Sequence, residues 1–260
     1  MHIAGAGMTH VGNVRASNED NLYLDGWYPD RMETDSNCSQ DHGGRCFHII
    51  RSDTTGQGTG RDWHAFAVSD GMGGERYGEV ASRIAVETLA ESDGPGLSFR
   101  MDEFIQKAND RVLQEMSLRA VSRMGAAVAV LVITEGGAAV CNLGDCRIYR
   151  FDGTDLEQLS VDHRTNSPAI YAGTLTQHLG VPRDEFILEP HIVTGIPVKA
   201  GDIYLLCSDG LTDMLSDERI GQILESMADD APERIAADLI GAALDRGGKD
   251  NVTVIIVKIS

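Results

Sequence analysis

Three aspartates share a setting that suits metal chemistry, because each lies where an apolar strand meets a turn. Asp70 follows the run HAFAVS and precedes Gly71, Asp209 follows IYLLCS, and Asp250 stands just before the run VTVIIVKI. A carboxylate at the end of a buried strand is costly unless it is paired or coordinates a cation. One Asp-Gly pair after a strand is more often a simple turn, but the three aspartates together predict a metal site.

A fourth acidic group, Glu19 and Asp20, precedes another predicted strand. The carbonyl of Gly71 adds an oxygen, because glycine lets the backbone turn sharply there. Oxygen ligands from several chain segments suit Mg²⁺ or Mn²⁺ and are poor ligands for zinc or copper. Arg15, four residues before Glu19, is either a salt-bridged surface arginine or a clamp on a phosphate group. The spacing alone leaves both interpretations open.

The predicted strands cluster together and so do the predicted helices, which favours antiparallel sheets covered by helices. Turn formers at Gly136-Gly137 and Gly144-Asp145 separate three consecutive strands and predict an antiparallel meander. The almost wholly apolar strand at 252–259 is expected to be central in its sheet. The predicted strands cover residues 21–25, 65–69, 126–134, 138–143, 147–151, 203–208 and 252–259, with a short one at 46–50.

Apolar side chains four residues apart predict helices over 75–92 and 101–119. A third helix is expected from Pro232, with Asp230 as its N-cap, to the glycines at 247–248. The polar, glycine-containing stretch at 26–62 predicts a long loop. We therefore predict a single α+β domain over residues 1–260, with a loop insertion at about 26–62.

The composition excludes several classes of protein. The chain has 260 residues, with 22 Lys+Arg against 40 Asp+Glu and a formal net charge of −18. This charge has the wrong sign for binding nucleic acid, so we expect no such partner. No apolar run approaches the roughly 18 residues of a membrane span, and no secretory signal is recognisable. The five cysteines lack the Cys-x2-Cys spacing of a zinc or redox site. We expect a monomer in a reducing cytoplasm.

Six short motifs, taken together, resemble those of the metal-dependent PP2C-type (PPM) serine/threonine phosphatases in their bacterial form. They occur in the family's order and extend over nearly the whole chain, which makes the set far more specific than any one member. The motifs are GNVRASNED at 12–20, SDGMGG at 69–74, NLGDCRIY at 142–149, DH at 162–163, LCSDGL at 206–211 and DNVT at 250–253.

The resemblance implies a four-layer α-β-β-α sandwich, in which two antiparallel sheets are flanked by helix pairs. It also implies a centre of two Mn²⁺ or Mg²⁺ ions. Asp70 would bridge both ions, with Asp209 and Asp250 on one ion and the carbonyl of Gly71 on the other.

By the same resemblance, Glu19 and Asp20 hold metal-bound waters and Arg15 binds the substrate phosphate. The implied reaction is hydrolysis of phosphoserine and phosphothreonine by direct attack of a water that bridges the two ions. Arg15 and the metals neutralise the equatorial oxygens of the phosphate. No phosphoenzyme forms, so no nucleophilic cysteine or serine is assigned. The implied partners are phosphorylated proteins, with a cognate bacterial serine/threonine kinase and its targets.

The chain departs from the family pattern in three places. Ala126 and Ala127 stand where the family commonly has threonines, and residues 120–124 lack the acid associated with a third metal, which predicts a weak or missing third site. Met72 replaces the histidine of eukaryotic relatives and leaves metal-bound water as the expected general acid. The segment 164–180 is short beside the family's flap. The first of these departures keeps one alternative open, a non-catalytic regulator that binds phosphoproteins on the same fold.

Four polar side chains close to the motifs are expected to be structural. His64 and His163 each adjoin a strand end and are expected to be hydrogen-bonded rather than catalytic. Asp145 and Arg147 are expected to pair with each other at a turn, although Asp145 could also support the metal ligands. No acid cluster has the spacing of an EF-hand calcium loop.

Overall fold

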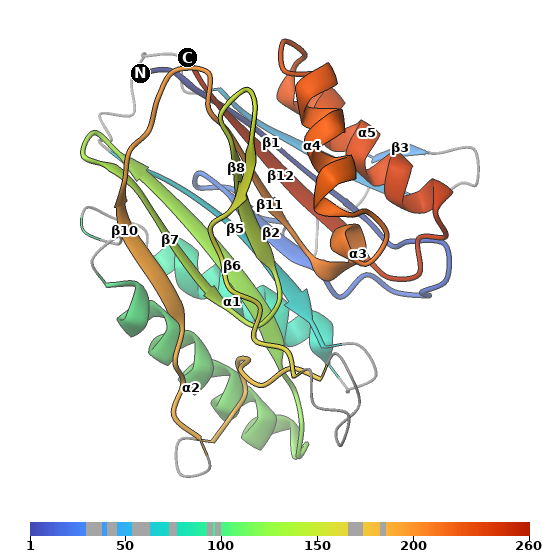
Figure 1. Ribbon diagram of the computed structural model, residues 1–260. Helices are drawn as coiled ribbons and strands as arrows, with labels where there is room; N and C mark the ends of the chain where they lie inside the picture. Colours follow the sequence, from blue (N-terminus) through green and yellow to red (C-terminus); the bar gives the residue numbers. More distant parts are fainter. Residues whose placement is uncertain are drawn as a thin grey trace.

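Two antiparallel sheets lie face to face between two layers of helices (Figure 1). The computed structural model describes residues 1–29, 38–40, 46–53, 63–72, 77–92, 96, 100–165, 174–182 and 186–260. This arrangement is the α-β-β-α sandwich that the motif resemblance implies, and every ladder between the named strands is antiparallel.

The five-stranded sheet is covered by the first two helices. Its central strands are apolar at almost every position because both faces are buried. In β6, alternate residues beginning with Val128 pack toward α1 and α2, and those beginning with Ala129 pack toward the other sheet. The strand order is β10 (His191–Ile196), β7 (Gly137–Leu143), β6 (Ala126–Thr134), β5 (Trp63–Gly71) and β2 (Asn21–Leu24), and the helices are α1 (Gly78–Ser92) and α2 (Met101–Arg119).

The seven-stranded sheet is covered by the C-terminal helices. Its middle strand is β12 (Val252–Ile259), as its apolar sequence predicts, and β12 pairs with both β1 and β11. The strand order is β3 (Cys38–Gln40), β4 (Cys46–Asp53), β1 (Ile3–His10), β12, β11 (Ile203–Cys207), β8 (Arg147–Phe151) and β9 (Leu156–Gln158). The helices are α3 (Asp209–Thr212), α4 (Asp217–Ser226) and α5 (Pro232–Asp245).

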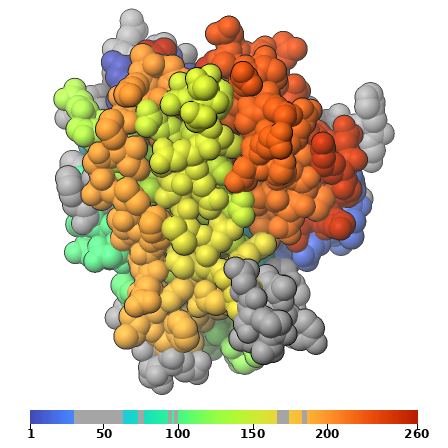
Figure 2. Space-filling model, viewed as in Figure 1, coloured from blue at the N-terminus to red at the C-terminus, as the bar shows by residue number. Residues whose placement is uncertain are grey.

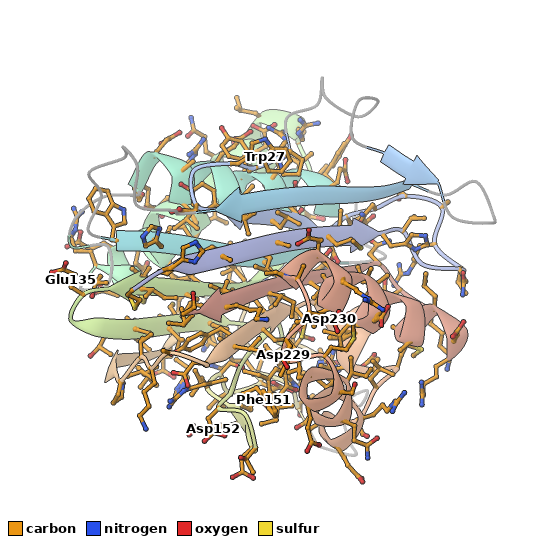
Figure 3. All side chains as sticks on the ribbon, turned by 90° about the horizontal axis from the view of Figure 1, so that it is seen from above. Trp27, Glu135, Phe151, Asp152, Asp229 and Asp230 are labelled. Carbon is orange, nitrogen blue, oxygen red and sulfur yellow. The ribbon has the colours of Figure 1, made fainter. Side chains whose placement is uncertain are left out.

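Three apolar clusters fill the spaces between the four layers. One joins α1 and α2 to the five-stranded sheet, one lies between the sheets, and one joins the seven-stranded sheet to α3, α4 and α5. Cys141 and Cys207 are fully buried members of these clusters. Figure 3 looks down on the layers from above and labels Asp152, in the β8–β9 turn, and Asp229 and Asp230, between α4 and α5.

The structure corrects several predicted element boundaries. The N-cap of α5 is Ala231 rather than Asp230, because Pro232 occupies the first helical turn. The predicted loop at 26–62 contains β3 and β4, which extend one edge of the seven-stranded sheet. The rest of that loop, from 30, and the predicted start of α1 at 75–76 lie outside the described residues. The strands β1, β3, β9 and β10 and the helices α3 and α4 were not predicted.

The predicted three-strand meander is wrong at its second turn. β6 and β7 form the expected hairpin, but β8 belongs to the other sheet. The chain crosses at Gly144, whose φ of +103° favours glycine, and a Cβ there would lie 2.5 Å from the Cβ of Ala127. Sequence patterning predicts the turn but not which sheet the next strand joins. This crossing places Asp145 between the two sheets.

Candidate metal centre

The three aspartates that the sequence singles out come from strand ends in both sheets. Asp70 is the second-last residue of β5 and pairs with Ala127 of β6. Asp209 begins α3 directly after β11, and Asp250 stands just before β12. All three line one cavity of about 650 Å³. The fold therefore brings together residues that are far apart in the sequence.

Asp20 is buried beside these residues and is held by hydroxyl groups. The hydroxyls of Ser208 and Thr253 donate to Asp20 Oδ2 at 2.7 and 2.6 Å, and the Thr253 hydroxyl lies 2.7 Å from that of Thr9. Ser208 directly precedes Asp209, so these bonds fix Asp20 against the strand end that carries a predicted metal ligand. Asp20 Oδ1 is buried and has no hydrogen-bond partner among the residues that the structure describes.

Glu19 is positioned by its backbone, which contacts both β5 and α1. Its carbonyl accepts hydrogen bonds from the amide of Gly71 at 3.2 Å and from Ser82 Oγ at 2.5 Å. A Cβ on Gly78 would lie 2.7 Å from Glu19 Oε2, and one on Gly71 would lie 2.3 Å from the Gly78 carbonyl oxygen. The two glycines therefore allow three segments to meet. Burial, followed by the nearby Glu79, raises the pKa of Glu19.

Arg15 makes an ion pair and also reaches the cavity. Its Nη2 donates to Asp250 Oδ2 at 2.6 Å, and the two side chains are 39% and 34% exposed. Asn251 anchors the loop that carries Arg15, since its Oδ1 accepts from the Glu19 amide at 2.9 Å and its Nδ2 donates to the Ser17 carbonyl at 2.9 Å. The position of Arg15 is compatible with both interpretations, a salt-bridged arginine and a clamp on a phosphate group, because a guanidinium at a cavity wall can also bind phosphate.

Arg164 is a site residue that sequence reasoning missed. It lines the same cavity and contacts three carboxylates. Its Nη2 donates to Asp209 Oδ2 at 2.5 Å, its Nη1 to Asp213 Oδ1 at 3.3 Å, and its Nε to Asp145. The one signal in the sequence was its place directly after the Asp-His motif at 162–163.

The expected pair between Asp145 and Arg147 is wrong. Asp145 bonds to Arg164, whereas Arg147 forms a bidentate pair with Asp162, at 2.9 and 3.0 Å from Nε and 2.7 Å from Nη2. Arg147 Nη1 also lies 3.3 Å from Asp217 of α4. The reason is the chain crossing, which leaves Asp145 at the cavity while Arg147 begins a strand of the other sheet.

The two histidines near the motifs are hydrogen-bonded, as predicted. His64 Nδ1 lies 2.9 Å from Asp25 Oδ2, away from the cavity. His163 Nδ1 accepts from the amide of Gly144 at 3.1 Å, and the His163 amide donates to the Gly144 carbonyl at 2.9 Å. His163 therefore fastens the segment before Arg164 to the crossing turn.

The carboxyl groups of the site perturb one another. Burial raises the pKa of Asp70 well above its ordinary value, and the charges of Asp20 and Asp209 raise it further. Burial also raises the pKa of Asp20 to about 6 and that of Asp209 to about 7. Burial raises the pKa of Asp145 as well, although Arg164 opposes it. Such a group of carboxylates binds protons or cations in order to relieve its own repulsion.

The donor set fits hard divalent cations. Its atoms are carboxylate oxygens on several segments, and the partnerless Asp20 Oδ1 is a buried oxygen of the kind that a cation or an ordered water satisfies. Among the described residues, no group of three or more His, Cys, Asp or Glu side chains could hold a metal ion as it stands. Asp209 and Asp250 are instead bonded to Arg164 and Arg15. Each arginine therefore competes with an ion for one oxygen, Oδ2, of its aspartate.

The cavity is also lined by the segment between α2 and β6 and by the chain beyond the Asp-His motif. Ser122, Arg123 and Met124 line it, and Met72 donates its amide to the Gly125 carbonyl at 3.1 Å. Of the segment 164–180, residues 166–173 lie outside the described part of the chain. A weak or missing third metal site stays a prediction.

Comparison with protein families and curated proteins gives a consistent result. The family model described as protein phosphatase 2C matches residues 48–244. The serine/threonine protein phosphatase PstP of Mycobacterium tuberculosis is 31% identical over 207 residues, which cover 74% of this chain and 40% of PstP. The serine/threonine phosphatase Stp of Listeria monocytogenes is 30% identical over 210 residues, which cover 74% of this chain and 82% of that protein.

Solved structures extend the likeness to the whole chain. PppA, a regulatory component of the type VI secretion system (T6SS) of Pseudomonas aeruginosa, has a TM-score of 0.73 at 29% identity and covers 99% of this chain and 98% of its own. The catalytic domain of PstP in complex with two manganese ions has a TM-score of 0.72 at 25% identity and covers 100% of both chains. Arg15, Glu19, Asp20 and Asp250 lie outside the range of the family model, so their roles rest on geometry and motif resemblance. In the described residues, no helix is long and apolar enough to cross a membrane.

Proposed function

Since the chain belongs to the protein phosphatase 2C family, we propose that it is a metal-dependent protein phosphatase that hydrolyses phosphoserine and phosphothreonine. The matched family model covers most of the chain, but the chain spans only 40% of the length of PstP. The observation that carries the proposal is the convergence of Asp70, Asp209 and Asp250 with Arg15 on one cavity.

We assign the metal-binding role to Asp70, the carbonyl of Gly71, Asp209 and Asp250. When bound, two divalent cations supply acidification of a water molecule and neutralisation of phosphate charge. The crystal structure of the PstP catalytic domain contains manganese, which supports Mn²⁺ here, with Mg²⁺ as the alternative. Asp20 is held by two hydroxyls through one oxygen, which leaves Oδ1 to accept a hydrogen bond from water.

Arg15 orients the substrate in this proposal. Its guanidinium lies at the cavity, and the bidentate geometry of arginine matches two oxygens of a phosphate group. Glu19, whose carbonyl is fixed by Gly71 and Ser82, is placed to hold ordered water beside the metal ligands. No cysteine or serine nucleophile is required. We likewise propose that the substrates are phosphorylated proteins and that a cognate kinase phosphorylates them. A monomeric state and a cytoplasmic location are also proposals.

The proposal is tested by phosphate release from a phosphothreonine peptide. The purified chain with Mn²⁺ should release phosphate, and a chelator should stop it. Asp209→Ala and Asp250→Ala should each lower kcat/KM by at least roughly a hundredfold, because each removes a metal ligand. Asp229→Ala is the matched control, because Asp229 is an exposed acid between α4 and α5 (Figure 3) and should leave the rate unchanged.

Two results would count against the enzyme. Full activity in chelator would reject the metal-dependent mechanism. Phosphopeptide binding without turnover at saturating Mn²⁺ would favour the non-catalytic regulator, which the alanines at 126 and 127 kept open.

A further inference from the structure

Arg164 is built into the acid cluster more firmly than a surface arginine would be. Its side chain is 24% exposed and bonds to Asp145, Asp209 and Asp213. The backbone is hydrogen-bonded on both sides of Arg164, because the amide of His163 donates to the Gly144 carbonyl at 2.9 Å and the amide of Thr165 donates to the Thr174 carbonyl at 2.9 Å.

The three acids that hold Arg164 do not have the same role. Asp209 is assigned above as a metal ligand, whereas Asp145 and Asp213 are not. Asp145 has a side chain that is 7% exposed, so its charge has little access to water and Arg164 Nε is its cationic partner. Arg164 therefore has two contacts, to Asp145 and Asp213, that do not involve an assigned metal ligand. Its third contact, from Nη2 to Asp209 at 2.5 Å, involves one.

The electrostatic consequence follows from the sign of the charges. Without metal, Arg164 neutralises part of a cluster of carboxylates that repel one another. A divalent cation that binds Asp209 competes with the Nη2 hydrogen bond for Oδ2 and must also approach a fixed positive charge. Both effects act in the same direction, against metal binding.

We propose that Arg164 is a resident counter-ion of the acid cluster, which divalent metal displaces from Asp209, and that it thereby lowers the affinity of the site for metal. This inference rests on the proposed function, since that function makes Asp209 a metal ligand. Arg164 acts here through Asp209 and is a positioning residue. The contacts with Asp145 and Asp213 retain the side chain at the cavity after the exchange.

The test measures Mn²⁺ binding and metal-free stability, without reference to activity. Arg164→Ala should bind Mn²⁺ roughly tenfold more tightly by calorimetric titration, because one charge-assisted hydrogen bond no longer has to be broken. In chelator, the same variant should unfold at a lower temperature than the wild type. Arg164→Gln, which keeps hydrogen-bonding capacity without the charge, serves if the alanine variant fails to fold, and it too should bind Mn²⁺ more tightly.

Arg150→Ala is the matched control. Arg150 lies on the same strand as Arg147 but toward the far end, where its Nη2 bonds to Asp202 at 3.0 Å, next to the turn that contains Asp152 (Figure 3). This variant should lower the unfolding temperature and leave the Mn²⁺ affinity unchanged. Unchanged or weaker Mn²⁺ binding by both Arg164 variants would overturn the inference. A wild type that binds no Mn²⁺ would instead contradict the proposed function.

Discussion

At the scale of single residues, the cavity combines three aspartates with Arg15 and Arg164. Asp70, Asp209 and Asp250 were predictable because burial at the end of an apolar strand is costly for a carboxylate and needs a reason. Arg164 was not, because an arginine in a polar segment is ordinary, and only the fold brings Asp145, Asp209 and Asp213 to it. A local sequence pattern can identify a carboxylate at the end of an apolar strand. It cannot identify an arginine in a polar segment whose acidic partners are distant in the sequence.

The raised pKa of Asp209 gives a prediction about pH in the absence of metal. A carboxyl whose folded pKa is about 7, above its unfolded value, stabilises the fold when protonated, and this stability is lost as the pH rises from about 4 through 7. In chelator, the unfolding free energy of the wild type should therefore fall, relative to that of Asp209→Asn, as the pH rises. The slope is at most about 1.4 kcal/mol per pH unit and levels off above pH 7.

This pH dependence can be measured by urea unfolding of both proteins between pH 5 and 8.5. The difference between them reports Asp209 together with the carboxyls that its charge perturbs, such as Asp70. Groups such as His163, whose pKa is lowered first by burial, titrate in both proteins. Parallel curves for the wild type and the variant would show that Asp209 does not hold a proton in the folded state.

At the scale of elements, the prediction of strand pairing succeeded for β6 and β7, which are consecutive in the chain. The β6–β7 hairpin follows from its turn and its apolar strands. The step from β7 to β8 does not, because a two-residue turn in the sequence reads the same whether the next strand pairs or crosses. In Figure 2 the consequence is visible at the surface, where the yellow segment around residues 150–165 lies between the orange segment of β10 and the red-orange segment of α4.

The crossing turn should be intolerant of a side chain at Gly144. Gly144 and Gly153 both have positive φ, of +103° and +98°, but a Cβ on Gly144 would collide with Ala127 whereas one on Gly153 would meet nothing within 4 Å. Gly153→Ala should cost about 1–2 kcal/mol of unfolding free energy through backbone strain. Gly144→Ala should cost about 1–3 kcal/mol more through overpacking. Equal losses in chemical denaturation would mean that the close approach at Gly144 is not limiting.

At the scale of the whole molecule, the site joins the two sheets. Asp70 belongs to the five-stranded sheet, whereas Asp209 and Asp250 adjoin strands of the seven-stranded sheet. An apolar cluster also joins the two sheets along their facing sides. A cation shared by these aspartates would add a link across the sandwich at the end where the acids repel one another.

That link predicts how the protein should unfold. A ligand present at a hundred times its dissociation constant stabilises the fold by about 2.7 kcal/mol, which for a chain of this size corresponds to roughly 5–10 °C in Tm. Mn²⁺ should therefore raise the Tm by that amount in a calorimetric scan, and Asp70→Asn should abolish the shift. Because the metal would bind both sheets, a single transition should move as a unit, in agreement with the predicted single domain. Two separate transitions, with only one sensitive to Mn²⁺, would instead mean that the sheets unfold independently and that the aspartates do not share an ion across them.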